Sequence, residues 1–354
     1  MEKDKVVTVA TLAKKLGVST ATVTKALNGQ GRISEATVKR VRDLAREMKY
    51  VPNLAARALR TNVKDAVGIL ITSDIVNPWY SQLTSLLETE LSKRGLTMLL
   101  ALGKGKEERI EHALDNFFGG RVRGIIAGPV VNSQDAKVLQ SAIDRQIPLV
   151  IFSNLERIPL NFVALDQAAG ARIMLEHLYQ LGHRKIFYIG GIPADFEKKS
   201  GEIVTRSGAY IDFMKRHGLK PEFLSDGENY GITRRTAYDV MNHILKTTSY
   251  KDLPTAILAH NDDAAMGVLL ALQQAKIRVP EDISLTGFDD IAESSYSVPS
   301  LTTIGGVMET QACELVDTLE RIIQNGDVLR QKFITPKLII RESTAVPRKE
   351  ILKK

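Results

Sequence analysis

The sequence predicts a two-part fold: an N-terminal all-α head of the helix-turn-helix type, followed by an α/β body of two doubly wound parallel-sheet subdomains. Three observations lead to this prediction. Residues 8–48 carry the 3–4 spacing of short amphipathic helices, and from residue 66 onward short apolar strands alternate with helices. The net positive charge also lies almost entirely before residue 63, and 354 residues exceed what one ordinary core needs.

The charge distribution sets the first 62 residues apart from the rest. They hold 13 lysines and arginines against 5 acidic residues, a net charge of +8. The remainder holds 35 basic and 36 acidic side chains, so the whole-chain charge of +7 belongs to the head. A basic head on a neutral body predicts a polyanionic partner. The alternative is a small domain that is basic without such a partner.

The composition narrows the class of protein. A hydrophobic content of 44% and a charged content of 25% are typical of soluble globular proteins. No apolar stretch approaches the roughly 18 residues of a membrane span, and "MEKDKVV" lacks the apolar core of a signal peptide, so we expect a cytoplasmic protein without membrane contact. The single cysteine, Cys313, excludes an internal disulfide and fits a reducing compartment. The histidines show no metal-ligand spacing, so we expect no metal and no other cofactor.

Three helices are predicted in the head. Thr8 can cap the first and Gly17 ends it, Ser19 caps a second that runs to about Leu27, and Ser34 caps the third. Their apolar residues fall on one face of each helix: Val9, Leu12, Ala13, Leu16, Val23, Ala26, Leu27, Val38, Val41, Leu44, Ala45 and Met48.

The second helix is predicted to be the one that reads DNA. Thr20, Ala21 and Lys25 lie on its outer face once Val23 and Ala26 are buried. In a helix-turn-helix unit, the start of this helix meets base edges in the major groove while flanking lysines and arginines hold phosphates.

The segment "YVPNLAARALR", residues 50–60, is unusual because it has no wide apolar face and is too short for a stable isolated helix. It also carries two arginines. A plain linker is one interpretation. The other is a helix that forms only against a partner.

The body is predicted to hold two sets of parallel strands with helices between them. The first set comprises strands 66–72, 97–101, 124–128 and 149–153, with helices near 81–94, 107–118 and 135–145. The second comprises strands 162–166, 185–190, 256–259 and 284–288, with helices near 167–181, 205–217, 233–246 and 262–275.

The head and the body together resemble the lactose-repressor (LacI/GalR) family of bacterial transcription regulators. In the head, "TLAKKLGVSTATVTKALNG" and "YVPNLAARALR" match the family pattern, although Thr24-Lys25 replaces the common Ser-Arg and Thr11 replaces an acidic residue. In the body, "VNPWYSQL", "LGHRKIFYIGG", "HNDDAAMGVLLAL", "VPEDISLTGFDD" and "VPSLTTI" recur in the family's order and spacing. The resemblance covers roughly residues 8–345.

This resemblance implies a domain plan. It gives a DNA-binding domain over 1–52, a hinge helix and linker over 53–63, and a periplasmic-binding-protein-like core over 64–347. Within the core, the N-subdomain takes about 64–163 plus 306–330 and the C-subdomain about 164–304 plus 335–347. The implied crossings between subdomains lie near 163–165, 303–306 and 330–336.

The resemblance also implies the residues that contact DNA. In the head they are Ser19, Thr20, Ala21, Thr22, Lys25 and Asn28, and in the hinge helix Asn53, Ala56, Arg57 and Leu59. The hinge helix of the family folds when two subunits meet over DNA, which fits a helix too weak to stand alone. Leu59 is then an apolar wedge for the minor groove.

A ligand site is expected where the carboxyl ends of the two sets of strands face each other. Polar residues follow these strands: Ser73, Asp74, Ser153, Asn154, Asn261, Asp262, Asp289 and Asp290. The resemblance implies ligand contacts from Trp79, Tyr80, Ser153, Arg206, Tyr230, Asn261, Asp262 and Asp289. Each has an alternative: the aspartates could cap helices or turns, Arg206 could pair with a surface acid, and Trp79 could lie in the core. The segment 190–205 aligns poorly with the family.

The predicted function is a homodimeric, DNA-binding transcription repressor that associates with the bacterial nucleoid when bound to its operator. A small sugar or sugar derivative in the cleft would set operator affinity, and a purine is the alternative ligand. An enzyme is the rival class, yet "GGIPAD" is not a G-x-G-x-x-G fingerprint and no phosphate loop or Ser-His-Asp spacing occurs. An exported binding protein is opposed by the basic head and the missing signal peptide.

Overall fold

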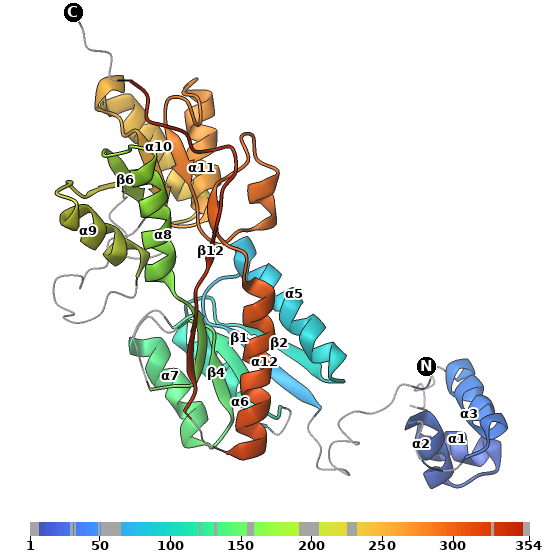
Figure 1. The fold of residues 1–354 in the computed structure, drawn as a ribbon. Coiled ribbons are helices and arrows are strands. Elements are labelled where there is room, and N and C mark those ends of the chain that lie inside the picture. The colour runs from blue at the N-terminus through green and yellow to red at the C-terminus, as the bar shows by residue number, and fades with distance from the viewer. Residues whose placement is uncertain are drawn as a thin grey trace, which may run out of the picture. The chain divides into compact units, whose positions relative to one another are not determined.

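The computed structural model describes residues 7–28, 31, 33–48, 50, 65–119, 122–130, 133–153, 159–190, 205–224, 232–326 and 329–349. The chain forms two compact units, Met1–Lys64 and Asp65–Lys354. Figure 1 shows the three-helix head and the larger α/β body, each of which is described by itself below.

The head folds as the sequence predicts. Its helices are α1 (Val9–Leu16), α2 (Thr20–Asn28) and α3 (Glu35–Glu47). The Thr8 side chain accepts a hydrogen bond from the Thr11 amide, and Gly17 ends α1 in the left-handed conformation at φ 66°. The Ser19 and Ser34 hydroxyls accept hydrogen bonds from the amides three residues on, which satisfies donors at the starts of α2 and α3. The buried residues of its core are Leu12, Ala13, Val23, Ala26, Val41 and Ala45.

The first sheet of the body has six parallel strands in the order β11-β5-β4-β3-β1-β2. These strands are β1 (Ala66–Ile71), β2 (Thr97–Leu102), β3 (Ile125–Gly128), β4 (Leu149–Ile151), β5 (Phe162–Leu165) and β11 (Gln331–Ile334). Its helices are α5 (Pro78–Lys93), α6 (Glu107–Phe118), α7 (Ser133–Asp144) and α12 (Met308–Asn325). Helices α5 and α12 bury their leucines against one face of the sheet, and α6 and α7 cover the other.

The second sheet has four parallel strands in the order β7-β6-β8-β9. These strands are β6 (Ile186–Ile189), β7 (Glu222–Leu224), β8 (Ala256–Ala259) and β9 (Ser284–Thr286). Helices α8 (Gln167–Gln180) and α9 (Arg206–Arg216) cover one face, and α10 (Arg234–Thr247) and α11 (Asp262–Gln274) cover the other. Two short 3-10 turns lie at Tyr250–Asp252 and Ala292–Ser295.

Three stretches of chain join the two sheets (Figure 1). The first runs from β5 into α8, the second from β10 (Thr303–Gly305) into α12, and the third from β11 into β12 (Lys337–Ile339). Strands β10 and β12 pair antiparallel, so two of these stretches brace each other.

The prediction for the strand at 162–166 was wrong in one respect. It was expected in the second sheet, but β5 pairs with β4 through Ile151 and Phe162 and with β11 along its whole length. A fully buried apolar strand carries no signal that assigns it to one sheet or another. Only its partners, and the register they set, decide this.

Other elements differ in extent or were not predicted. Helix α5 begins at Pro78 rather than 81, because Asn77 caps it and proline is favoured at the first helical position. Strand β7 has three residues and was not predicted, since so short a run shows no periodicity. Helix α12 and the strands β10, β11 and β12 were also not predicted as elements.

Candidate functional site

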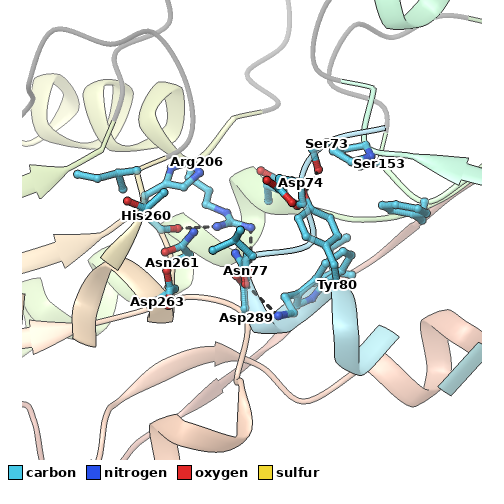
Figure 2. A pocket seen from close by; sticks show the side chains of 18 of the residues that line it. Ser73, Asp74, Asn77, Tyr80, Ser153, Arg206, His260, Asn261, Asp263 and Asp289 are labelled. Carbon is cyan, nitrogen blue, oxygen red and sulfur yellow. Dashed lines mark hydrogen bonds and ion pairs between the residues drawn. The ribbon is translucent and has the colours of Figure 1, made fainter. Parts of the chain in front are cut away.

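A cavity of about 430 Å³ lies between the carboxyl ends of the strands of the two sheets. Figure 2 shows Ser73, Asp74 and Tyr80 on one side of it and His260, Asn261 and Asp263 on the other. Its volume is within the range of small-molecule sites. The parallel topology explains the location, because every strand of each sheet ends at the same edge and delivers its following loop there.

The wall from the first sheet combines aromatic rings with short polar side chains. Trp79 and Tyr80 leave the first turn of α5 with ring centroids 5.2 Å apart, and Trp79 lies 5.9 Å from Phe152, which follows β4. Ser73 and Ser153 line the cavity beside them. Burial raises the pKa of the Tyr80 phenol, so this hydroxyl stays protonated at neutral pH. This wall offers flat apolar faces and hydroxyl groups to a ligand.

The wall from the second sheet is organised around an ion pair. Arg206, at the first position of α9, places Nη2 3.1 Å from Oδ1 of Asp289, and its Nη1 donates to the His260 carbonyl. The guanidinium carbon also lies 3.7 Å from the centroid of the Phe288 ring, in a cation–π contact. The side chains of Arg206 and Asp289 are only 11% and 5% exposed, so water screens their interaction little.

Asn77 connects the two walls. Its Oδ1 accepts a hydrogen bond from the Trp79 amide at 2.9 Å, which caps α5 on the first sheet. Its side chain also favours the ionised form of Asp289, which follows β9 on the second sheet, and so lowers the pKa of that carboxyl group. A residue that caps a helix of the first sheet therefore influences the ion pair of the second.

Asp289 is electrostatically perturbed. Burial raises the pKa of its carboxyl group to about 6, against the opposing influence of Arg206 and Asn77. Its backbone has φ 114°, a conformation that side-chain-bearing residues rarely adopt. The unusual backbone conformation and the shifted pKa together make Asp289 a candidate functional residue of the cavity.

His260 contributes a neutral ring to the cavity. Burial and the positive charge of Arg206 lower the pKa of its imidazole to about 3. Its Nδ1 is hydrogen-bonded to the Tyr188 hydroxyl at 2.7 Å. The imidazole is therefore uncharged throughout the physiological range.

The structure places Asp262 outside the cavity, contrary to the expected ligand contact. Its Oδ2 accepts from the Ile291 amide at 3.0 Å, its Oδ1 accepts from the Thr303 hydroxyl, and the residue is fully buried. Asp263 lines the cavity instead, where it pairs with Arg234 at 2.9 Å. One helical step turns a side chain by about 100°, so only one of two adjacent residues at the start of α11 can face the cavity.

Of the other residues expected to contact the ligand, six line the cavity and one lies outside the described residues. Trp79, Tyr80, Ser153, Arg206, Asn261 and Asp289 line the cavity. Asn261 also caps α11, since its Oδ1 accepts from the Ala264 amide at 2.7 Å. Tyr230 lies outside the described residues.

Several cavity residues were missed by sequence reasoning. They are Asn77, Phe152, Thr233, His260, Asp263 and Gln311, among others. His260 directly follows β8 and could have been found by the same strand-end rule as Asn261. Gln311 carried no such signal, because it lies within α12, far along the chain from the strands that it approaches.

In the head, the face of α2 that is expected to contact the bases of DNA is exposed. Thr20, Ala21 and Lys25 are exposed on α2, while the Ser19 hydroxyl hydrogen-bonds the half-buried Thr22 at 2.9 Å. The Asn28 side chain and residues Asn53, Ala56, Arg57 and Leu59 lie outside the described residues.

Within the described parts of the chain, no cluster of three or more histidine, cysteine or acidic side chains is arranged to hold a metal ion. No helix among the described residues is long and apolar enough to cross a membrane.

A helix-turn-helix head and a two-sheet body with a cavity at the strand ends define a ligand-binding DNA regulator, and comparisons with known proteins agree. Residues 8–53 match the model of the bacterial regulatory proteins of the lacI family, and residues 175–344 match the periplasmic binding protein-like domain. The ribose operon repressor of Escherichia coli (strain K12) is 30% identical over 345 residues, covering 95% of this chain and 99% of that protein. The chain therefore belongs to the lacI family.

Two further matches extend this result. The transcriptional repressor PurR of Haemophilus influenzae (strain PittEE) is 28% identical over 342 residues, covering 95% of this chain and 98% of its own. The structure of the Lac repressor bound to ONPG in the repressed state superposes with a TM-score of 0.80 at 25% identity, covering 96% of this chain and all of that one. These relatives are transcription regulators, so the chain is a DNA-binding regulator and not an enzyme.

Proposed function

We propose that this protein is a repressor that binds a pseudo-palindromic operator as a dimer and responds to a small uncharged sugar in the cavity between its sheets. The single observation that carries the proposal is the Arg206–Asp289 pair, which is buried in the cavity wall and influenced from the first sheet by Asn77. A ligand that competes for any of these three groups changes the polar contacts at the facing walls of the cavity.

Chemical complementarity supports a sugar. Carboxylate and amide oxygens can accept from several hydroxyl groups at once, and the faces of Trp79 and Tyr80 suit the C–H side of a sugar ring. The charges of Arg206 and Asp289 cancel, and Arg234 balances Asp263, which leaves Asp74 as the unbalanced charge among the described lining residues. This balance disfavours sugar phosphates. The name of the ribose-operon relative is consistent with a sugar.

A purine is the second candidate, favoured by a different observation. Trp79, Tyr80 and Phe152 form an aromatic cluster with centroid separations of 5.2–6.4 Å, against which a flat base could pack. PurR, whose name indicates a purine regulon, is among the relatives.

The coupling to DNA follows from linkage. A ligand that prefers one arrangement of the two sheets shifts the population of the operator-binding state by its differential affinity. We assign the DNA contacts to the outer face of α2 and to residues 53–60, with Leu59 as a minor-groove wedge, and part of the dimer contact to the outer face of α5.

A paired assay tests this proposal. Thermal shift of the full-length protein with D-ribose, D-xylulose, D-galactose, ribose 5-phosphate and hypoxanthine identifies the ligand class, and an operator gel shift with the same compounds tests the response. We expect an uncharged sugar to raise the melting temperature and change operator affinity. Saturation by hypoxanthine and by no sugar would assign the purine class, and tighter binding of ribose 5-phosphate than of ribose would contradict the charge argument.

A further inference from the structure

Gln311 occupies an unusual position in the cavity. It lies on α12, is fully buried, and belongs to the lining of the cavity between the two sheets. Its Nε2 donates to the Phe152 carbonyl at 3.0 Å and to the Val163 carbonyl at 3.1 Å. Phe152 directly follows β4 and Val163 lies near the start of β5. These strands pair only through Ile151 and Phe162, so the amide bridges them where their ladder is short.

These two bonds fix the orientation of the amide. Both hydrogens of Nε2 are used, and a flipped amide would place Oε1 against two carbonyl oxygens, which cannot donate. Oε1 therefore points away from the strands and can only accept. Among the described residues it has no hydrogen-bond partner, although it is buried. A buried acceptor without a partner is unfavourable, so this position favours any molecule that supplies a donor.

A second buried group without a partner lines the same cavity from the other sheet. Arg206 uses Nη1 and Nη2 in its contacts with His260 and Asp289, but its Nε has no partner among the described residues. One unfilled acceptor on α12 and one unfilled donor on α9 therefore belong to residues that line the same cavity. A hydroxyl-rich ligand, or a base with both ring N–H and ring N, carries a group suited to each of them.

We infer that Gln311 determines ligand specificity, with Oε1 accepting a hydrogen bond from a hydroxyl or ring N–H of an uncharged ligand. This inference rests on the proposed function of the cavity and adds a requirement to it. The ligand must carry a donor at one defined position, and a fluorine, an ether oxygen or an ionised oxygen there is rejected. A site built around a buried hydrogen-bonding group discriminates strongly against ligands that lack the matching group.

The competing interpretation is that Gln311 only staples β4 to β5. Both interpretations predict that replacing Gln311 affects the protein, so a loss of affinity by itself does not separate them. They differ in whether the loss depends on a single donor of the ligand.

The experiment is a thermodynamic cycle that combines protein variants with ligand analogues. Affinities are measured by titration calorimetry on the full-length protein. The parent ligand is the tightest binder among D-ribose, D-xylulose, D-galactose and hypoxanthine. It is compared with analogues in which one donor is removed: single deoxy and deoxyfluoro sugars, or N-methylated hypoxanthines. The variants are Gln311→Met, which keeps the length of the side chain, and Gln167→Met, the same substitution at another cavity residue.

We expect one analogue to bind the wild type and Gln167→Met about 10- to 100-fold more weakly than the parent does, and to bind Gln311→Met as well as the parent does. Equal losses in all three proteins for every analogue would overturn the role of Gln311 while leaving the proposed function intact. If no compound binds the wild type, the proposed ligand classes fail and this inference fails with them.

A crystal structure of the wild-type complex provides a test that does not depend on the folding of a variant. We expect a ligand donor about 2.7–3.2 Å from Gln311 Oε1. A bound ligand that presents only carbon or an acceptor to Oε1 would overturn the inference.

Discussion

The Nη2 atom of Arg206 lies 3.1 Å from Oδ1 of Asp289, and this contact joins α9 to the turn after β9 at the wall of the cavity. Both side chains are nearly buried. A buried ion pair contributes little net stability, but removing one partner strands the other charge at a large cost. The pair is therefore suited to respond when a ligand competes for either member.

Arg206→Met is expected to abolish the ligand response. Methionine keeps an unbranched stem near Phe288 but removes the donors to Asp289 and to the His260 carbonyl. The head is a separate unit, so specific DNA binding should persist and become insensitive to ligand. Operator gel shifts with and without ligand measure this.

Asp262→Ala is the comparison for Arg206→Met, because Asp262 lies outside the cavity that Arg206 lines. It should lower the free energy of unfolding by about 1–3 kcal/mol, because the buried Thr303 hydroxyl and Ile291 amide lose their acceptor. Any Asp262→Ala protein that remains folded should bind ligand normally. A selective loss of ligand binding without destabilisation would return Asp262 to the set of ligand contacts.

The pKa of Asp289 predicts a pH-dependent difference in stability between the wild type and Asp289→Asn. The folded protein holds this proton up to pH about 6, whereas the unfolded chain releases it near 3.8. Wild-type stability therefore falls as the pH rises between these values, and asparagine does not titrate. The unfolding free energy of Asp289→Asn minus that of the wild type should rise by roughly 2 kcal/mol from pH 4 to 6.5 and then level off.

Asp282→Asn serves as the control of opposite sign. Hydrogen bonds from Arg278 hold the pKa of the Asp282 carboxyl well below its usual value, so the wild type gains stability from this group as the pH rises. The unfolding free energy of Asp282→Asn minus that of the wild type should therefore decrease as the pH rises. Urea denaturation at a series of pH values measures both variants, and equal slopes would refute the assigned environments.

Gly267→Ala is expected to destabilise the body by about 1–3 kcal/mol or more. A Cβ atom at Gly267 on α11 would collide with the Arg234 carbonyl oxygen and lie 3.0 Å from the Tyr238 amide nitrogen, both of them backbone atoms of α10. Gly119→Ala is the control, because its added Cβ would meet its nearest atoms at 3.7 Å. Thermal denaturation should show a large drop for Gly267→Ala and almost none for Gly119→Ala, and similar values would contradict the close packing of α10 and α11.

DNA binding is expected to weaken by orders of magnitude between about 50 and 200 mM salt, because each phosphate that the +8 head neutralises releases a counterion.

Lys25→Ala on the exposed face of α2 should also relax the preference at one base pair per half-site by about 1–3 kcal/mol. Lys14→Ala, on the exposed surface of α1, should weaken all sites alike. Salt-insensitive binding would exclude the head as the contact surface, and an unchanged site preference would exclude Lys25 from base reading.

The sequence by itself determined the features whose causes are local. Helix α1 begins at Thr8 and ends at Gly17 because a capping hydroxyl and a left-handed glycine act within one turn of chain. The alternation of apolar strands and helices predicted parallel sheets, since only a crossover helix can connect parallel neighbours at short range. The strand-end rule then predicted Asp289 near a cleft, because parallel strands bring all their carboxyl ends to one edge, whereas Arg206 was implied only by the family resemblance.

Tertiary structure alone decided the features that depend on distant partners. Strand β5 joined the first sheet because β4 and β11 flank it, a relationship that its own four residues do not encode. The choice between Asp262 and Asp263 depended on the rotation of α11 against the cavity, which the packing on α10 and β8 sets. Gln311 reached the cavity only because α12 lies across β4 and β5, where hydrogen bonds to two carbonyls orient its amide and leave its oxygen as an acceptor.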